Sequence, residues 1–577
     1  MSKPRWSWLP QPDTWKYHAL LLSLGIFVLG PLGGVTASYM NFSLGFYIGG
    51  QVLAGILGST VTYGYGVEGK HGANYIQTAA ASVASLSAMG VLIQAMVWMG
   101  LPQPPVWQMV LYFLCIGMFA AGMGMLYTPI LVDRMQLMFP SGLAVANILR
   151  ALTDPVLLKR SVKQLGGGIL AGFAVPLAAL KVELIDKIYF SASTFGAGMV
   201  VGARIGIPAI TSAFIGYLLV PWFVSIGWLQ EGDPYRKITF LIALGMIMGA
   251  ALLDISLILW EFAGRLKSGP KQVAPEQPDW KKVNTQKLVA WVAAWGIGVI
   301  ATGHVVLQQP LLYLCIAVAL VFVFVMVNGI SLGLTDSNPI SSAFVVSVLV
   351  MATAGLTDPG VGLLAGAIML ISTNTAADMQ QDRSTGWRLG TNRVMQFRYQ
   401  AAGILMGAIM GVVFAKLFMA AYPVLLQDQT VMKAADQPAA WSAAMTYKFV
   451  GVLRSLTQPK PYQLTAIWWG VGLGLAFQLA RKIVGTKNFI VDAILLPSPY
   501  AFSFGGFVNY ATSMWFGGGG VASSLFNTLV KSKKTKDESL PEDMSTTSLV
   551  GGGLIAGDAI AALGIGIFGL LTTLLKS

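Results

Sequence analysis

The stretch WQMVLYFLCIGMFAAGMGMLYTPIL, residues 107–131, decides the fold class because it contains no charged side chain. A transmembrane helix needs about 20 consecutive, mostly apolar residues. Its glycines are compatible with that role, since small residues let membrane helices approach one another closely. The stretch therefore predicts a helix that crosses a membrane.

The composition of the whole chain has the same character. Its 577 residues are 55% apolar and 11% charged, whereas soluble domains contain about 25% charged residues. The chain also contains 66 glycines but only 2 cysteines. These numbers exclude a disordered chain, a disulfide-rich secreted domain and an ordinary cytosolic enzyme. They predict an all-α polytopic membrane protein.

Comparable apolar runs recur along the chain. In the first half they lie near residues 17–38, 42–62, 75–99, 107–131, 164–182, 189–208, 210–229 and 238–260. In the second half they lie near residues 288–306, 308–328, 333–353, 358–377, 396–420, 463–480, 489–509, 511–530 and 547–573. We therefore expect about 16 transmembrane helices.

The segment GRLKSGPKQVAPEQPDWKKVNTQK, residues 264–287, interrupts this pattern. It is rich in Lys, Arg and Pro and has no apolar run, so we interpret it as a solvated cytoplasmic linker. It divides the chain into an N-terminal transmembrane half, residues 1–263, and a C-terminal half, residues 288–577. Within the second half, residues 421–462 are moderately polar and predict either an external loop or a partial helix.

The net charge of +13 follows the expected membrane topology. The Lys and Arg residues fall in short loops between apolar runs, as the positive-inside rule describes for cytoplasmic loops. The charge therefore does not indicate a nucleic-acid partner. Because basic residues also precede the first apolar run, we expect a retained first span and a cytoplasmic N-terminus.

Three segments are too broken for plain membrane spans, namely residues 138–149, 193–208 and 495–510. Irregular backbone at membrane depth is tolerated only where protein or a water-filled cavity surrounds it, so such segments indicate a transport site. Two similar stretches, GILAG at 168–172 and GILMG at 403–407, predict an internal duplication. The pattern does not decide between parallel and inverted repeats.

Five stretches carry a family resemblance: FPSGLAVANI at 139–148, GAGMVVGARIGIPAITSAFIGYL at 196–218, LTDSNPIS at 334–341, DMQQDRSTGWRLGTNRVMQ at 378–396 and LPSPYAFSFGGFVNY at 496–510. In this order they resemble the oligopeptide transporter (OPT) family, which includes the yellow-stripe-like metal-chelate transporters. The resemblance implies secondary active transport, usually proton-coupled uptake of small peptides or peptide-like chelates.

The chain lacks the Asn-Pro-Gly stretch of the eukaryotic peptide-transporting branch and looks more like the prokaryotic members. The resemblance then implies a multi-pass protein of the bacterial inner membrane, a plasma membrane. The expected partners are the lipid bilayer, a small peptide or chelate, and protons. A homo-oligomer is compatible with the sequence.

Ionisable groups inside membrane helices are candidates for function, because each costs about 2.5–3.5 kcal/mol on insertion scales. Arg204 could bind a substrate carboxylate, or it could be a structurally paired arginine. Asp254 and Asp558 could couple transport to protons, or they could be buried partners of basic residues.

A polar run begins after the apolar stretch that ends near residue 377. Asn374 and Asp378 share one face if the helix continues, which would make both substrate-binding residues and Asp378 a proton-coupling residue. The alternative is a solvated cytoplasmic loop. Asp336 and Asn338 are either substrate-binding residues or an ordinary helix cap.

The remaining predicted substrate-binding residues offer hydroxyl, amide or ring groups in or beside the broken segments. They are Tyr127, Ser141, Asn147, Tyr500, Asn509 and Tyr510. The tyrosines could instead be anchors at the membrane interface. If the short helix that starts at Ser141 points its N-terminus into a cavity, its dipole would favour an anionic group.

No cofactor, metal site or catalytic residue is expected. The 3 histidines are scattered, and the sequence contains no Walker A, HExxH or GxSxG motif. The alternatives to peptide transport are a metal-chelate or siderophore-type transporter of the same family and, from another class, a membrane-embedded enzyme. A channel is disfavoured because no filter sequence recurs.

Overall fold

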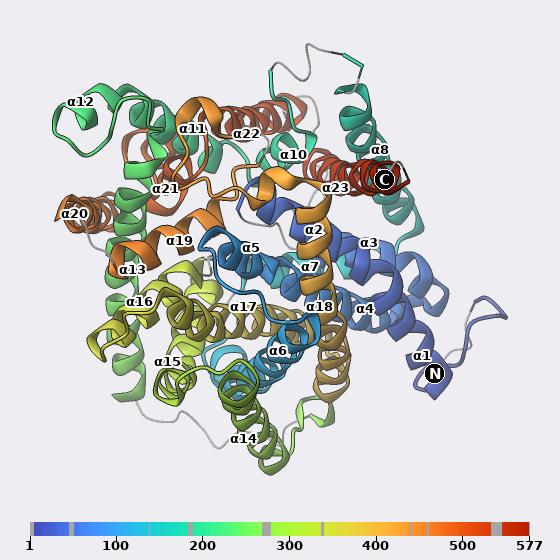
Figure 1. The fold of residues 1–577 in the computed structure, drawn as a ribbon. Coiled ribbons are helices and arrows are strands. Elements are labelled where there is room, and N and C mark those ends of the chain that lie inside the picture. Colours follow the sequence, from blue (N-terminus) through green and yellow to red (C-terminus); the bar gives the residue numbers. More distant parts are fainter. Residues whose placement is uncertain are drawn as a thin grey trace.

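The computed structural model describes residues 5–45, 51–137, 139–179, 181–182, 188–267, 278–335, 338, 340–438, 441–457, 461–531 and 545–575. In this part of the chain every regular element is a helix (Figure 1). The all-α fold class is therefore confirmed.

Ten helical stretches among the described residues are long and apolar enough to cross a membrane. They are Trp15–Ser43, Ala54–Trp98, Val106–Arg134, Pro155–Ala179, Arg236–Asp254, Asp279–Val306, Leu311–Gly333, Pro359–Leu389, Arg393–Ala421 and Thr546–Ile565. The prediction of a polytopic membrane protein is thus confirmed. The total of about 16 crossings, which included shorter and broken segments, stays a prediction.

The α-helices are α1 (Trp15–Ser23), α2 (Gly30–Ser43), α3 (Gln51–Thr62), α4 (Gly69–Ser87), α5 (Val91–Trp98), α6 (Val106–Thr128), α7 (Pro140–Ala151), α8 (Pro155–Ala179), α10 (Ala192–Val201), α11 (Ala203–Leu218), α12 (Val220–Ser225), α13 (Arg236–Lys267), α14 (Thr285–Ala301), α15 (Leu311–Thr335), α16 (Ile340–Thr353), α17 (Pro359–Leu389), α18 (Arg393–Ala421), α19 (Ala444–Thr457), α20 (Pro461–Val484), α21 (Pro499–Phe507), α22 (Tyr510–Lys531) and α23 (Thr546–Leu574). A short π-helical turn, η9 (Val491–Leu495), precedes α21.

Helix α17 forms the centre of the molecule (Figure 1). It packs against α4, α6, α7, α15 and α16, and most of its residues are buried. It begins with Asp358, whose carboxylate accepts a hydrogen bond from the backbone N–H of Gly360 (2.7 Å), a standard N-terminal cap. It ends at Gly390, whose φ of +74° suits a residue without a side chain.

Around this centre, two pairs of helices pack so closely that only glycine fits at the point of contact. A Cβ atom on Gly403 of α18 would lie 2.4 Å from the carbonyl oxygen of Ala79 on α4, and one on Gly168 of α8 would lie 2.4 Å from that of Val550 on α23. Both glycines begin one of the two similar stretches found in the sequence. Each stretch therefore makes a close helix contact, while the internal duplication stays a prediction.

Two broken helices pack against each other. Helices α10 and α11 are separated at Gly202, which has φ +78° and ψ 178°. Helices α21 and α22 are separated by the extended Val508 and by Asn509. Because α22 packs against both α10 and α11, the two breaks belong to one assembly. The predicted breaks in residues 193–208 and 495–510 are confirmed, as is the short helix in residues 138–149.

Some predicted boundaries were wrong. The bounds of the runs 189–208 and 210–229 differ from those of the helices, since α10 ends before Gly202, α11 continues from Ala203 to Leu218, and the short α12 follows. The run 358–377 ends too early, because α17 continues to Leu389. Hydropathy ends a span where polar residues begin, whereas buried polar partners allow a helix to continue.

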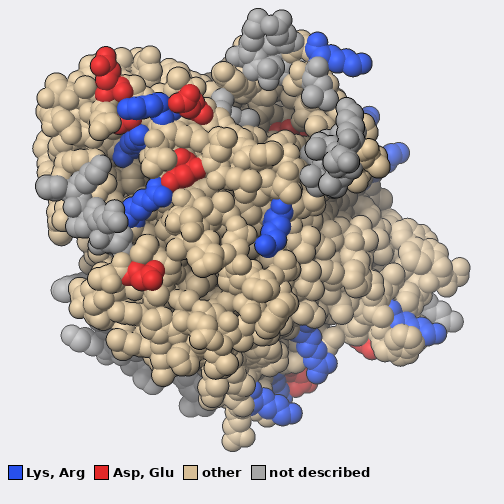
Figure 2. Space-filling model, viewed as in Figure 1, with Lys and Arg blue, Asp and Glu red and all other residues tan. Residues whose placement is uncertain are grey.

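Charged side chains are sparse on the face shown in Figure 2, where wide uncharged areas separate them. The predicted linker 264–287 is only partly described: α13 reaches Lys267, and the described chain resumes at residue 278 and starts α14 at Thr285. The division into two halves therefore stays a prediction. In residues 421–462 the predicted partial helix is present as α19.

Candidate functional site

Helix α17 carries its polar run into the core of the protein. Every residue from Gly362 to Gly386 is buried except Asp378 and Gln381, which are half-buried. These two residues lie three positions apart and therefore share a face of the helix. The alternative of a solvated loop for this run is wrong, and the predicted helical face with Asn374 and Asp378 is present.

The C-terminal part of this polar run, at Asp382 and Arg383, contacts α4 and α18. The side-chain amide of Gln77 donates to Asp382 Oδ1 (2.6 Å). The amide of Gln396 donates to the backbone carbonyl of Asp382 (2.8 Å) and to Thr78 Oγ1 (3.1 Å). Its oxygen accepts from Arg383 Nη1 (2.9 Å). Three helices therefore join in one buried polar cluster.

The N-terminal part of the polar run, at Thr373 and Asn374, contacts α4 and the segment before α16. Asn374 Nδ2 donates to Ser85 Oγ (2.8 Å). Asn338 Nδ2 donates to the carbonyl oxygen of Thr373 (3.3 Å), and Asn338 Oδ1 accepts from Asn328 Nδ2 (2.9 Å). The structure thus brings together the predicted Asn338, Asn374 and Asp378. We call the buried polar residues of α17 and their partners on α4, α15 and α18 the α17 seam. The predicted Asp336 lies outside the described residues.

The first turn of the short helix α7 contacts the same seam. Thr385 Oγ1 donates to the carbonyl oxygen of Gly142 (2.9 Å), in the first turn of α7. The predicted Ser141 and Asn147 are both half-buried on this helix. Tyr127 lies on α6 and donates its hydroxyl to the carbonyl oxygen of Phe322 (2.8 Å), so it ties α6 to α15.

A cavity of about 860 Å³ is lined by Lys159, Arg160 and Lys163 and by none of the predicted site residues. Two further cavities contain predicted or acidic residues. The larger of these two, of about 710 Å³, is lined by the predicted Asn509 and Tyr510 together with three further tyrosines, Arg236 and Asp233. The smaller, of about 310 Å³, is lined by Asp13, Glu68, His71, Tyr75 and Trp280 among others.

The cavities at Asn509 and at His71 lie toward opposite ends of one helical run. His71 lies at the start of α4, and Trp98 ends α5, about 27 residues or 40 Å further along the run. The Trp98 carbonyl accepts a hydrogen bond from Arg454 Nη2 (3.1 Å), and Arg454 also pairs with Asp428 (2.6 Å). Asp428 belongs to the loop whose Ala434 lines the larger cavity.

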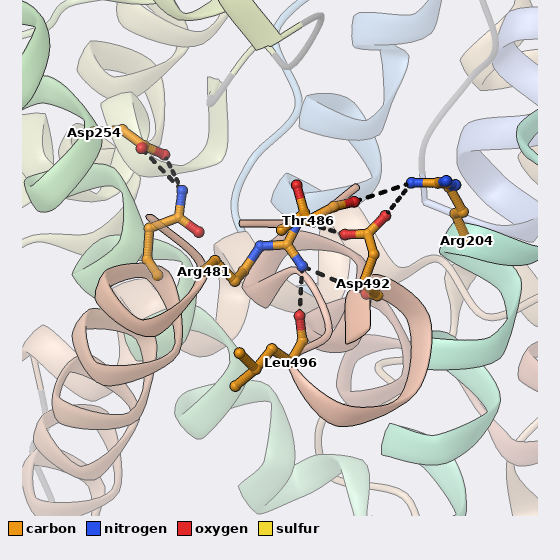
Figure 3. A network of polar contacts seen from close by, with 7 residues as sticks. Arg204, Asp254, Arg481, Thr486, Asp492 and Leu496 are labelled. Atoms are coloured by element: carbon orange, nitrogen blue, oxygen red, sulfur yellow. Dashed lines mark hydrogen bonds and ion pairs between the residues drawn. The ribbon is translucent and has the colours of Figure 1, made fainter. Parts of the chain in front are cut away.

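Arg204 lies in a separate ion-pair network (Figure 3). Its Nη1 contacts Asp492 Oδ2 (2.8 Å), and Arg481 Nη2 contacts Asp492 Oδ1 (2.7 Å). The Arg204 side chain is 51% exposed. Asp492 lies in η9, so the network joins α11, η9 and α20, none of which packs closely on α17.

Asp254 has its own partners on α20 and α21. Its carboxylate accepts two hydrogen bonds from Gln478 Nε2 (2.9 and 2.8 Å) and one from the predicted Tyr500 (3.1 Å). Lys482 Nζ lies 3.2 Å away. Figure 3 shows Asp254 apart from the Arg204 network. A basic partner for Asp254 was one of the two sequence hypotheses.

Asp558 is a buried carboxylate on α23, only 2% exposed. It accepts hydrogen bonds from the backbone N–H of Ser193 (2.7 Å) and from Ser191 Oγ (3.2 Å). Within the described part of the chain it takes part in no ion pair. Its partners lie at the start of α10, beside the broken helices.

Sequence reasoning missed several polar residues of the α17 seam. Gln77 and Thr78 lie on α4, and Gln396 lies on α18. On α4 they belong to a polar stripe with Asn74, Ser82 and Ser85 at helical spacing, a signal that could have been found within the apolar run. Among the residues that the structure describes, no group of three His, Cys, Asp or Glu could hold a metal.

Lys448 on α19 was also missed, because it falls in the segment predicted as loop or partial helix. Its Nζ donates to Ser341 Oγ (3.1 Å) and lies 4.4 Å from the ring centroid of Phe507. Ser341 belongs to the fragment 334–341, and Phe507 belongs to the fragment 496–510. Two of the five quoted stretches therefore meet at this lysine.

A comparison with protein-family models matches residues 18–568 to the OPT oligopeptide transporter protein family. The chain belongs to the OPT family. The resemblance predicted from the five stretches is confirmed, whereas the prokaryotic branch and the yellow-stripe-like relation stay predictions. A search of curated proteins finds no match.

Membership of the OPT family makes this chain a transporter of oligopeptides or related substrates, and OPT proteins are transporters rather than enzymes. Together with the ten membrane-length helices among the described residues, it also makes the chain a multi-pass membrane protein. The predicted substrate-binding and proton-coupling roles of individual residues stay predictions.

Proposed function

We propose that this OPT protein is a proton-coupled symporter that takes up small peptides or peptide-like substrates by alternating access. The observation that carries the proposal is the pair Asp378 and Asp382, one helical turn apart on α17 within the buried seam. Transport energised by protons requires a group inside the membrane that can bind and release a proton, and these carboxylates are such groups.

Two carboxylates one turn apart repel each other when both are ionised, and the low dielectric of a buried site strengthens that repulsion. A proton bound to one of them relieves it. One negative charge then remains, and a substrate ammonium group would balance it. Proton and substrate together would therefore neutralise the pair and stabilise one conformation of the seam, which is the coupling that a symporter needs.

Alternating access requires that the site reach each side of the membrane in turn. The cavities at Asn509 and at His71 lie toward opposite ends of the protein, with the seam of α17 between them. The paired broken helices offer the movable part, because their interrupted backbones can bend where continuous helices cannot. We place the His71 cavity and the N-terminus on the cytoplasmic side of a bacterial inner membrane, following the positive-inside rule.

Among the predicted coupling residues, Asp378 ranks first because it shares a helix face with Asn374 and neighbours Asp382. Asp558 ranks second, since it is buried and lies beside a broken helix. Asp254 ranks third, because Lys482 already balances its charge at 3.2 Å.

The test is uptake into proteoliposomes of a mixed library of di- to pentapeptides, with metal chelates assayed in parallel, under an imposed inward proton gradient. The variants are Asp378→Asn and Asp382→Asn. Asp279→Asn is the matched control, since the Asp279 side chain is 95% exposed and pairs with the nearby Lys282.

We expect wild type and the control to accumulate peptides above the external concentration, and to stop when the gradient is collapsed. The two seam variants should lose accumulation. Accumulation that ignores the gradient would contradict proton coupling. Uptake of the chelates without uptake of peptides would contradict peptide transport and assign the metal chelates as the substrate class.

A further inference from the structure

Lys448 is a cation placed deep within the protein without a carboxylate partner among the described residues. Helix α19 packs against α2, α5, α16, α17 and α21, and Figure 1 shows it between α21 and α17. From Trp441 to Leu453 every residue is buried except Lys448, which is half-buried. Lys448 therefore keeps a small exposed fraction although its helix is enclosed.

The present partners of Lys448 do not balance its charge. Ser341 offers one neutral hydroxyl, and Phe507 offers the face of its ring, which attracts a cation only weakly. A buried charge is expensive unless it is paired and hydrogen-bonded. The ammonium group has three N–H donors. Among the described residues it donates one hydrogen bond, to Ser341, so two donors remain for a negatively charged partner.

Other enclosed cations differ from Lys448. Arg393 holds Asp133 through two hydrogen bonds of 2.8 Å. Arg236 has no carboxylate partner within the described ranges, but it is fully buried and donates to the carbonyl oxygen of Ser442 and to the side-chain oxygen of Gln429. The enclosed Arg383 likewise has no carboxylate partner among the described residues, but Arg236 and Arg383 are both buried, whereas Lys448 is half-buried.

The position of Lys448 links the larger cavity to the seam. Phe507 ends α21 two residues before Asn509, which lines the larger cavity. On the other side, Ser341 follows Asn338 by three residues, and Asn338 donates to Thr373 of α17. A substrate that passes from the cavity toward the seam would meet Lys448 between them.

We propose that Lys448 binds a carboxylate of the transported substrate, the C-terminal carboxylate in the case of a peptide. The inference rests on the proposed function, since it deepens the choice of substrate. It replaces Arg204 in this role, because the Arg204 guanidinium already faces Asp492 at 2.8 Å. A substrate carboxylate would supply the ion pair that Lys448 lacks.

The test compares two forms of one tripeptide library, with free C-terminal carboxylates or with C-terminal amides. Binding is measured by thermal shift of the purified protein, and uptake is measured in proteoliposomes. The variants are Lys448→Gln, which removes the charge, and Lys448→Arg, which keeps it. Arg204→Gln is the matched control, since it removes a cation that already has a partner.

We expect wild type, Lys448→Arg and Arg204→Gln to prefer the free carboxylates, by about tenfold for an ion pair worth 1.4 kcal/mol. Lys448→Gln should bind and transport both libraries equally, still driven by the proton gradient. If Lys448→Gln does not fold, the wild-type preference still decides: equal affinity for the two libraries would overturn the inference.

The two proposals fail in different ways. A wild-type protein that takes up both libraries equally, under the control of the proton gradient, contradicts the role of Lys448 and leaves symport intact. A preference for free carboxylates without any response to the gradient supports Lys448 and contradicts proton coupling. A preference that disappears in Arg204→Gln instead of Lys448→Gln would assign the carboxylate to the arginine.

Discussion

The α17 seam and the Arg204 network differ in how completely their polar groups are paired. In the network, the carboxylate of Asp492 faces two guanidinium groups at 2.8 and 2.7 Å. In the seam, both side-chain polar atoms of Gln380 are buried with no hydrogen-bond partner in the part of the chain that the structure describes, and so are Nε and Nη2 of Arg383. Buried polar groups are usually paired, since an unpaired group costs about 1–3 kcal/mol.

The difference separates structure from function. A matched network stabilises the fold and gains little from a ligand, because its hydrogen bonds are already made. An incompletely matched seam costs stability, but it can accept water, a proton or a substrate. Proteins tolerate such local costs mainly where they carry out their function, which supports transport through the seam.

The largest effect is expected for Asp378→Asn. The amide cannot bind and release a proton, so uptake against a concentration gradient should fall to the level of empty liposomes. Exchange of labelled for unlabelled peptide at equal concentrations should continue, since it needs no net proton movement. Loss of both activities, with a normal melting temperature, would indicate that Asp378 binds substrate and does not couple it to protons.

A smaller effect, on stability only, is expected for Asp492→Ala. It leaves Arg204 and Arg481 without their shared carboxylate. Breaking a buried pair costs about 3–5 kcal/mol, but Arg204 is half exposed, so solvent should reduce the loss to about 1–2 kcal/mol. Thermal unfolding in detergent measures it. A transport defect at full stability would break the distinction between the two regions.

Gln380→Leu should increase stability, whereas Asp492→Ala should decrease it. Gln380→Leu removes a buried amide that has no partner among the described residues, which should raise stability by about 1 kcal/mol, while uptake through the altered seam should slow. Thermal unfolding and initial uptake rates are measured on the same preparation. Lower stability together with unchanged uptake would mean that Gln380 is an ordinary core residue.

The smallest effect concerns Asp233 at the larger cavity, outside the membrane-spanning helices. Burial raises the pKa of this carboxyl, but hydrogen bonds from Lys237 (2.8 Å) and Lys433 (3.0 Å) outweigh burial, so its net pKa lies below 3.8. A lowered pKa adds stability that is present above pH 4 and is lost as the pH falls through the folded-state pKa.

Asp233→Asn should therefore flatten the acid limb of the stability curve below about pH 4, by up to about 1 kcal/mol. Melting temperatures between pH 3 and pH 7 provide the measurement. An unchanged acid limb would show that the two lysines do not stabilise the ionised form.

The fold class could be predicted because hydropathy alone marks membrane helices, as the run that became α6 illustrates. The family could be predicted because its stretches contain unusual Pro and Gly positions, such as those around Gly202. Helix boundaries failed where polar residues are buried, since hydropathy does not record the partners that Gln77 and Gln396 provide for α17.

The candidate site was predictable only in part. Asn338, Asn374 and Asp378 stand out as polar residues beside apolar runs, and the structure brings them together. Arg204 looked equally promising, because a sequence does not reveal that Asp492, far along the chain, reaches it. Lys448 was missed for the converse reason, since its surroundings looked like a loop.

Proton movement that accompanies peptide uptake tests the central claim most directly. A pH-sensitive dye inside proteoliposomes, with the membrane potential clamped at zero, reports the internal pH after peptide is added outside. We predict acidification on peptide addition in wild type and in Asp279→Asn, and none in Asp378→Asn or Asp382→Asn. Peptide accumulation in the wild type without acidification would contradict proton coupling at the α17 seam.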